Sequence, residues 1–300
     1  MNNKLINDLL IKSILPFFIT QSKVLKKDYI KYMLTIDATN LFNEHLKLEI
    51  RALKNIRTNL KKKMKGAPSD EIMRLHEDIV TIRNVLRKFD IFQRAIQYSS
   101  KIDTLNIQIC STTQASFTWR MWFDMFCEIA KLDTEPWRKE LLAKALAIES
   151  FKCGSIGLNT LEIISTIEKE MFYSFGNTLD IAISINDELL IPNISAYSQI
   201  TSLILPNSNL NEFNNTMINM TDLGLIKNYN YLMAYHQPNN QYIFSYGNET
   251  YFFDSDKQLC IENAFSLTTL GKKLASLYER KANDLGKIIF KTLVEDLSFR

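Results

Sequence analysis

The densest group of chemically useful side chains is a basic run between Lys47 and Lys65. The run holds eight Lys or Arg residues and one acidic residue, Glu49, so its net charge is +7. Ammonium and guanidinium groups bind phosphate oxygens, and such contacts give salt-sensitive binding that does not depend on base sequence. The alternative interpretation is a solvated helix face. The candidate contacts with nucleic acid or another partner are Lys54, Arg57, Lys61, Lys62, Lys63 and Lys65.

A second candidate is the glycine-containing segment CGSIGLN, residues 153–159. Backbone N–H groups at the start of a helix can hold an anion, and small residues let the anion approach. The same residues also serve simply to turn one helix into the next. The segment therefore indicates either an anion site or a helix–helix turn.

The remaining residue types do not form a familiar catalytic centre. The four cysteines are scattered without a CxxC pair, and the three histidines lie far apart in the chain. This spacing is typical of free thiols in a reducing cytosol and does not predict a zinc site. No GxSxG, HExxH, P-loop or GxGxxG motif occurs. We therefore expect no catalytic residue, no metal site and no cofactor, with a cryptic nuclease or hydrolase as an alternative.

The basic run lies on the first of two predicted long helices. Apolar residues recur at spacings near three, four and seven over residues 38–65, and again from Ile72 to Phe89. Between these stretches, Gly66 suits the position just after a helix and Pro68 prevents the first helix from continuing. The pattern predicts an antiparallel helical hairpin with the lysines near its tip.

The rest of the chain is predicted to be mainly helical, with strands toward the C-terminus. Helices over 194–205 and 208–226 are followed by a Tyr- and Phe-rich β-meander over 229–261, with turns at 237–240, 247–249 and 255–257. This order predicts a winged helix with an enlarged β-wing and a C-terminal helix. The expected domains are a helical hairpin region (1–100), a central helical core (101–176) and a winged-helix-like domain (177–300).

The predicted winged helix is short of cations. No Lys or Arg lies between Lys169 and Lys227, whereas six acidic residues do. A DNA-recognition helix normally brings cations to the phosphates, and the presumed recognition helix, residues 209–222, has none. We therefore interpret this domain as a packing or protein-contact module.

Residues 119–277 carry a pattern that is similar to a known group of bacterial proteins. The segment WFDMFCEIAKLDTEPWRKELLAKALAIESFKCGSIGLNTLEIISTIEKEMFYSF, with DLGLI and LTTLG further on, resembles the abortive-infection alpha (Abi-alpha) family and related helical proteins of unknown function. The matching positions include Trp122, Phe123, Ala143, Ala147, Glu149, Ser155, Thr160, Leu161, Gly224 and Gly271.

The resemblance implies a role in anti-phage defence by abortive infection, in which an infected cell stops growing or dies before phage are released. The family brings no established catalytic residues. We therefore expect an effector or regulator that binds a partner protein or associates with itself, with nucleic-acid binding through the hairpin as the alternative. The chain shows no signal-peptide pattern and no apolar run of about 20 residues, which predicts a cytoplasmic protein without a transmembrane segment.

Overall fold

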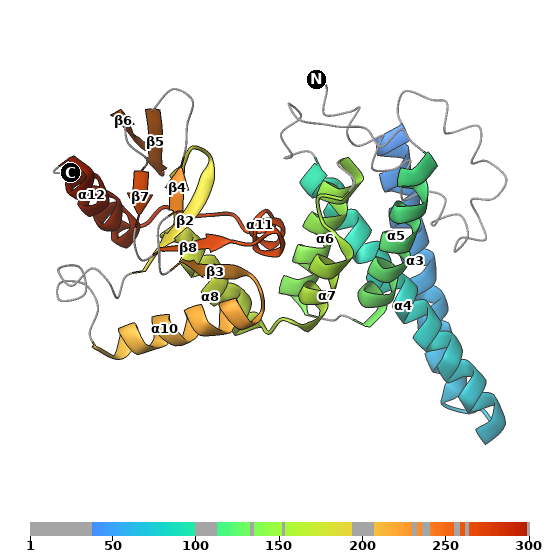
Figure 1. Ribbon diagram of the computed structural model, residues 1–300. Helices are drawn as coiled ribbons and strands as arrows, with labels where there is room; N and C mark the ends of the chain where they lie inside the picture. Colours follow the sequence, from blue (N-terminus) through green and yellow to red (C-terminus); the bar gives the residue numbers. More distant parts are fainter. Residues whose placement is uncertain are drawn as a thin grey trace. The chain divides into compact units, whose positions relative to one another are not determined.

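The computed structural model forms two compact units, one ending at Thr166 and the other beginning at Ile167. Helices dominate the described part of the chain, and the second unit also contains an antiparallel sheet (Figure 1). The mainly helical class is therefore confirmed. The residues that the structure describes are 38–99, 113–132, 135–151, 154–193, 207–229, 233–235, 241–254, 259–261 and 264–298.

The predicted helical hairpin opens the described part of the first unit. Helix α3 (Ala38–Met64) packs against helix α4 (Ser69–Ser99), and residues 65–68 connect them. Leu75 and Ile79 of α4 are buried, while most side chains around them are exposed. In Figure 1 the connected ends of the two helices project beyond the other helices of this unit.

The described part of the first unit also contains the helices α5 (Thr113–Leu132), α6 (Pro136–Phe151) and α7 (Leu158–Thr166). Both α5 and α6 pack against α4, and α7 packs against α5 and α6. Ala143 and Ala147 of α6 are fully buried, so their small side chains let the neighbouring helices approach closely.

Aromatic rings fill the space between α4 and α5. Trp122 stacks on Phe126 with ring centroids 5.3 Å apart, and Phe126 also lies 6.3 Å from Phe92 of α4. Each of these rings is almost fully buried. Burying an aromatic side chain removes a large apolar area from water, so this cluster is a main source of stability for the first unit.

The second unit is built on a six-stranded antiparallel sheet with the order β3-β8-β2-β1-β5-β6. Its strands are β1 (Ile183–Ile185), β2 (Glu188–Pro192), β3 (Ile226–Tyr229), β5 (Gln241–Tyr246), β6 (Glu249–Asp254) and β8 (Ala264–Leu267).

A second, two-stranded pair continues the hairpin made by β5 and β6. Strand β4 (Met233–Tyr235) pairs with β7 (Leu259–Ile261). Met233 lies opposite Ile261, and Gln241 lies opposite Asp254. The two pairs therefore follow the register of one long hairpin to within one residue.

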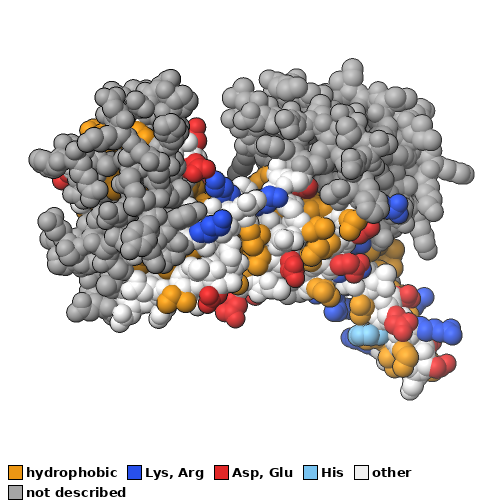
Figure 2. All heavy atoms as spheres, viewed as in Figure 1, with side chains coloured by type: hydrophobic (Ala, Val, Ile, Leu, Met, Phe, Trp, Pro, Cys, Tyr) orange, Lys and Arg blue, Asp and Glu red, His pale blue; other side chains and the backbone are white. Residues whose placement is uncertain are grey.

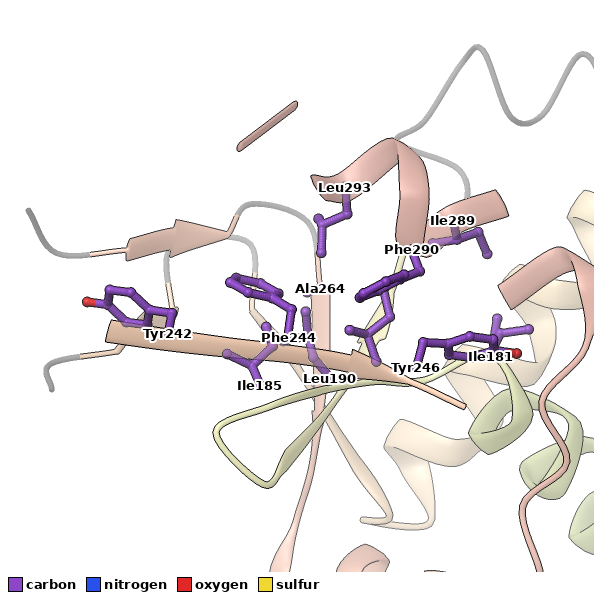
Figure 3. Packing of buried hydrophobic residues seen from close by; sticks show 11 residues of the cluster. Ile181, Ile185, Leu190, Tyr242, Phe244, Tyr246, Ala264, Ile289, Phe290 and Leu293 are labelled. Atoms are coloured by element: carbon purple, nitrogen blue, oxygen red, sulfur yellow. The ribbon is translucent and has the colours of Figure 1, made fainter. Parts of the chain in front are cut away.

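The described helices that accompany the sheet are α8 (Lys169–Asp180), α10 (Asn207–Asp222), α11 (Thr269–Ala275) and α12 (Asp284–Ser298). One face of the sheet is covered by α12, as Figure 3 shows from close by. Tyr246 of β5 stacks on Phe290 of this helix, with ring centroids 6.3 Å apart. The buried cluster between β5 and α12 includes Tyr242, Phe244, Tyr246, Ile289, Phe290 and Leu293.

The winged-helix prediction is wrong. Between α8 and α10 the chain forms a hairpin of β1 and β2, whose two strands lie in the middle of the sheet. Of the strands in the expected β-meander, β5 and β6 extend this six-stranded sheet, whereas β4 and β7 form the separate pair. The presumed recognition helix lies within α10, which packs against α8 and β3.

The predicted turns of the meander have different outcomes. The turn at 247–249 is confirmed, because Gly247 adopts a φ of 58° between β5 and β6. A glycine with positive φ at the first turn position is typical of a type II′ hairpin. The turns at 237–240 and 255–257, and the helix over 194–205, lie outside the described residues.

A two-residue turn explains why the segment after α8 doubles back. Asn186 and Asp187 have φ values of 47° and 68°, which is the pair of left-handed conformations required by a type I′ turn. The Asn186 side chain also accepts a hydrogen bond from the Ile243 N–H at 2.9 Å. The turn therefore both reverses the chain and ties β1 to β5.

This turn gives a stabilising prediction. Asp187→Gly is expected to raise the free energy of unfolding by about 0.5–1 kcal/mol, because glycine adopts a positive φ without steric cost. Thermal unfolding followed by circular dichroism measures the change. The control is Asn186→Gly, which relieves the same conformation but removes the hydrogen bond to Ile243 and should give a smaller gain or a loss. Equal stabilisation by both variants would contradict the role given to the Asn186 side chain.

Hydrogen bonds connect the end of α10 to the start of α11. Gly224 has a φ of 67°, and the Leu225 N–H donates to the Met220 carbonyl at 2.9 Å, which is the pattern of a Schellman helix end. The Thr268 hydroxyl donates to the Gly224 carbonyl at 2.6 Å and accepts from the Gly271 N–H at 3.0 Å. A single threonine therefore caps one helix and holds the end of another.

Candidate partner-binding surface

The six candidate cations lie on the projecting part of the hairpin, residues 47–83, which we call the arm. Figure 2 shows basic and acidic side chains together at its outer end. Of the six, only Arg57 is half-buried, because it lies on the stripe that faces α4; the others are exposed. The ion pairs among the described residues involve none of these six cations. Their charges are thus available to a partner.

The exposed cations of α3 are not spread evenly around the helix. Residues of an α-helix that are separated by three, four or seven positions share a flank. Lys54 and Lys61 are related by such a spacing, and Lys47 extends the row toward the base of the arm. Lys65 follows Lys61 by four positions, in the turn just after the helix, where its N–H donates to the Lys62 carbonyl at 3.3 Å. Lys63 lies on the opposite flank of the stripe that contacts α4. The structure therefore separates cations that are neighbours in the sequence.

Charged residues of α4 also differ between the two flanks of the arm. Because the two helices are antiparallel and right-handed, the flank of α4 beside the Lys54–Lys65 row carries His76 and Arg83, which are seven residues apart and exposed. We call the surface formed by Lys54, Lys61, Lys65, His76 and Arg83 the basic side. The sequence-based candidate set omitted His76 and Arg83, although their spacing was a sufficient signal once the hairpin was predicted.

The other flank of the arm has a mixed, more acidic character. It carries Glu71 and Asp78 of α4 together with Lys63 and Arg74, and all four side chains are exposed. We call it the acidic side. The arm thus presents two chemically different surfaces, the basic side and the acidic side, on opposite flanks of the same helix pair.

The glycine-containing segment after α6 does bind an anion, but the anion belongs to the chain itself. Both carboxylate oxygens of Glu149 accept backbone hydrogen bonds of 2.6 Å, one from Gly154 N–H and one from Ile156 N–H. Glu149 is only 2% exposed. The Trp122 indole N–H donates to the Ile156 carbonyl at 2.5 Å. This segment is therefore a helix–helix turn closed by an internal carboxylate.

A second buried polar group ties together the second unit. Asp180 accepts hydrogen bonds from the Tyr278 hydroxyl at 2.9 Å and from the Lys281 N–H at 2.7 Å. Burial, and then the Asp180 carboxylate, raise the pKa of Tyr278 to about 12. Arg280 donates to the carbonyls of Leu179 and Ala182. These groups hold the end of α8 to the segment before α12, and their bonding capacity is used within the fold.

No group of three or more His, Cys, Asp or Glu residues in the described part of the chain is placed to hold a metal ion. Cys127 is buried, and burial raises the pKa of its thiol to about 12. Because the thiolate is the reactive form, this cysteine is not a nucleophile at neutral pH. The side chain of His45 lies outside the described residues.

The acidic interval of the second unit is partly neutralised by later residues. Of its six carboxylates, Asp180 is buried in the polar group above, and Glu188 pairs with Lys272 at 3.0 Å. Lys272 of α11 thus supplies one cation to this interval. The charge count along the sequence overstated the acidity of this surface.

Most of the chain matches one protein family. Residues 87–285 match the family model described as "Protein of unknown function (DUF2806)". The chain belongs to the DUF2806 family. The matched segment runs through both compact units, whereas the arm cations lie before its first residue. The search of curated proteins and the search of solved structures each found no match.

The positions used for the Abi-alpha resemblance lie at the structural junctions of this DUF2806 protein. Trp122 and Glu149 meet at the α6–α7 turn, and Gly224 and Gly271 meet at the α10–α11 junction. Ser155 lies within the first of these turns, and Phe123, Ala143, Ala147, Thr160 and Leu161 are buried. These residues therefore hold the scaffold and leave the arm as the candidate contact surface. No helix in the described ranges is both long enough and apolar enough to cross a bilayer.

Proposed function

We propose that this DUF2806 protein is a binding protein of anti-phage defence, an effector or regulator of abortive infection that contacts its partner through the arm. The observation that carries the contact surface is the set of exposed arm cations without ion-pair partners among the described residues. The defence role is supported by the resemblance of residues 119–277 to the Abi-alpha family. A cytoplasmic location follows from the same proposal.

A projecting helical hairpin suits a binding role for a physical reason. Most side chains at its outer end are exposed, so they contribute little to the core of the unit. Charge changes at such exposed positions usually alter stability by less than about 0.5 kcal/mol. The arm can therefore be altered without unfolding the scaffold, which makes the proposal easy to test.

The test compares phage yield and host survival in the natural host with and without the gene. Deletion is expected to raise phage yield, and a variant with Lys61, Lys62, Lys63 and Lys65 all changed to Glu is expected to behave like the deletion. Protein level and circular dichroism of that variant serve as the folding control. Unchanged phage yield and host survival on deletion would overturn the defence role. Full protection by the quadruple variant would remove the arm from the mechanism.

A further inference from the structure

We propose that the basic side of the arm binds the phosphate backbone of duplex DNA without regard to base sequence. This inference rests on the proposed function, because it names the partner of the same surface. Its starting point is the separation of Lys54, Lys61, Lys65 and Arg83 from the carboxylates of the arm. A partner that binds this row of cations selectively must carry a matching row of negative charges.

The length of the row fits a polymer of phosphates. At a rise of about 1.5 Å per residue, Lys54 and Lys65 are about 16 Å apart along the arm, and Lys47 extends the row to about 27 Å. Lys47 pairs with Glu44 at 2.8 Å, so it is the least available of these cations. Duplex DNA carries one charge per about 1.7 Å of its axis, which supplies phosphates over this whole distance.

The chemistry of the basic side argues against an ordinary protein partner. Protein interfaces are held by buried aromatic or apolar anchors surrounded by a polar rim. The exposed apolar side chains of α3, Leu48 and Ile56, lie off the basic side according to their helical spacing. Charge–charge contact with little apolar area is typical of backbone binding to nucleic acid.

The basic side offers few groups that could recognise a sugar. Recognition of an RNA duplex relies on its shape and on contacts to 2′-hydroxyl and phosphate groups. Thr58, a neutral polar residue in the row between Lys54 and Lys61, donates its hydroxyl to the Lys54 carbonyl at 2.9 Å. The groups left on the basic side are mainly cations, which bind phosphates and do not distinguish sugars or bases.

The test uses the full chain, a fluorescent 24-base-pair DNA duplex of arbitrary sequence, and salt between 50 and 200 mM. With four cations engaged, the slope of log K against log salt is expected to be about −3 to −4. The double variant Lys61→Gln/Lys65→Gln is expected to reduce the magnitude of the slope by about 2 and to weaken binding roughly 60-fold at 0.1 M salt.

The matched control is Lys63→Gln/Arg74→Gln, which removes two charges from the acidic side of the same arm. It is expected to weaken binding by less than about threefold, since those charges lie about a Debye length from the bound phosphates. Equal losses in the two double variants would overturn the assignment to one side. Tighter binding of an RNA duplex of the same length would overturn the assignment to DNA.

The outcomes of the DNA-binding and phage experiments separate this inference from the proposed function. Absence of salt-dependent DNA binding, combined with loss of phage protection in the Lys61→Gln/Lys65→Gln variant, would overturn this inference in favour of an acidic protein partner and leave the proposed function standing. DNA binding with unchanged phage yield on gene deletion would overturn the defence role. Selective loss of both DNA binding and protection in the basic-side variant supports both.

Discussion

Replacing Glu149 with alanine is expected to lower the free energy of unfolding of the first unit by about 3–5 kcal/mol. The carboxylate accepts two backbone hydrogen bonds and is almost fully buried. Its removal leaves the N–H groups of Gly154 and Ile156 without this acceptor and opens a space at the α6–α7 turn. Hydrogen bonds to a charged acceptor are each worth about 1.5–3 kcal/mol, which sets the size of the effect.

Tryptophan fluorescence during denaturant unfolding measures this loss in the correct unit, because Trp119, Trp122 and Trp137 all lie before residue 167. Glu149→Gln retains one oxygen acceptor and should lose less stability than the alanine variant. The control is Glu162→Ala, because Glu162 is exposed on α7 and its removal should cost less than about 0.5 kcal/mol. A similar small effect at Glu149 would contradict the structural role of its carboxylate.

Gly271→Ala is expected to destabilise the second unit by about 3 kcal/mol or more. A Cβ at this position would lie 1.9 Å from the Leu225 carbonyl oxygen. The obstacle is backbone, and the Thr268 and Leu225 hydrogen bonds hold it in place. Relief of the clash therefore requires separation of α11 from the end of α10.

Hydrogen–deuterium exchange resolves this effect by segment. The amides of β3 and β8 should lose protection in the variant, because the junction leads directly into the pairing of Ile226 with Leu267. Gly66→Ala is the control, since no atom lies within 4 Å of the Cβ added there. Unchanged protection in β3 and β8 of the Gly271→Ala variant would show that the close approach to Leu225 is not required.

Local signals in the sequence were sufficient for the helical hairpin. Gly66 and Pro68 end the first helix by their backbone preferences, and apolar spacing specifies the contact stripe on each arm. Neither inference depends on residues far away in the chain. The turn at Gly247 was also predicted from local sequence, because glycine readily adopts the positive φ found there.

The sheet was misread because its strand order depends on distant pairing. Ile191 of β2 lies opposite Phe265 of β8, and no local pattern specifies such a partner. One local signal was overlooked: Asn186 and Asp187 stand between two aliphatic stretches, which favours a two-residue hairpin turn. Recognising it would have placed two strands after α8 and weakened the winged-helix prediction.

The candidate site was predicted in composition but not in arrangement. The sequence indicated that Lys61, Lys63 and Lys65 belong together, whereas the antiparallel helix pair places Lys63 on the opposite flank. The anion-binding character of the segment containing Gly154 was also anticipated. Its occupant, Glu149, was not, because a carboxylate inside the preceding helix has no sequence feature that marks it as the ligand.

The position of β8 has a consequence for how the chain is made. Strand β8 lies between β2 and β3, although it is synthesised after both of them. A nascent chain on the ribosome can complete the described helices of its first unit while β3 still lacks its strand neighbour. Translation that stops between residues 230 and 263 therefore yields a polypeptide with open edges on β2 and β3, a form prone to aggregation.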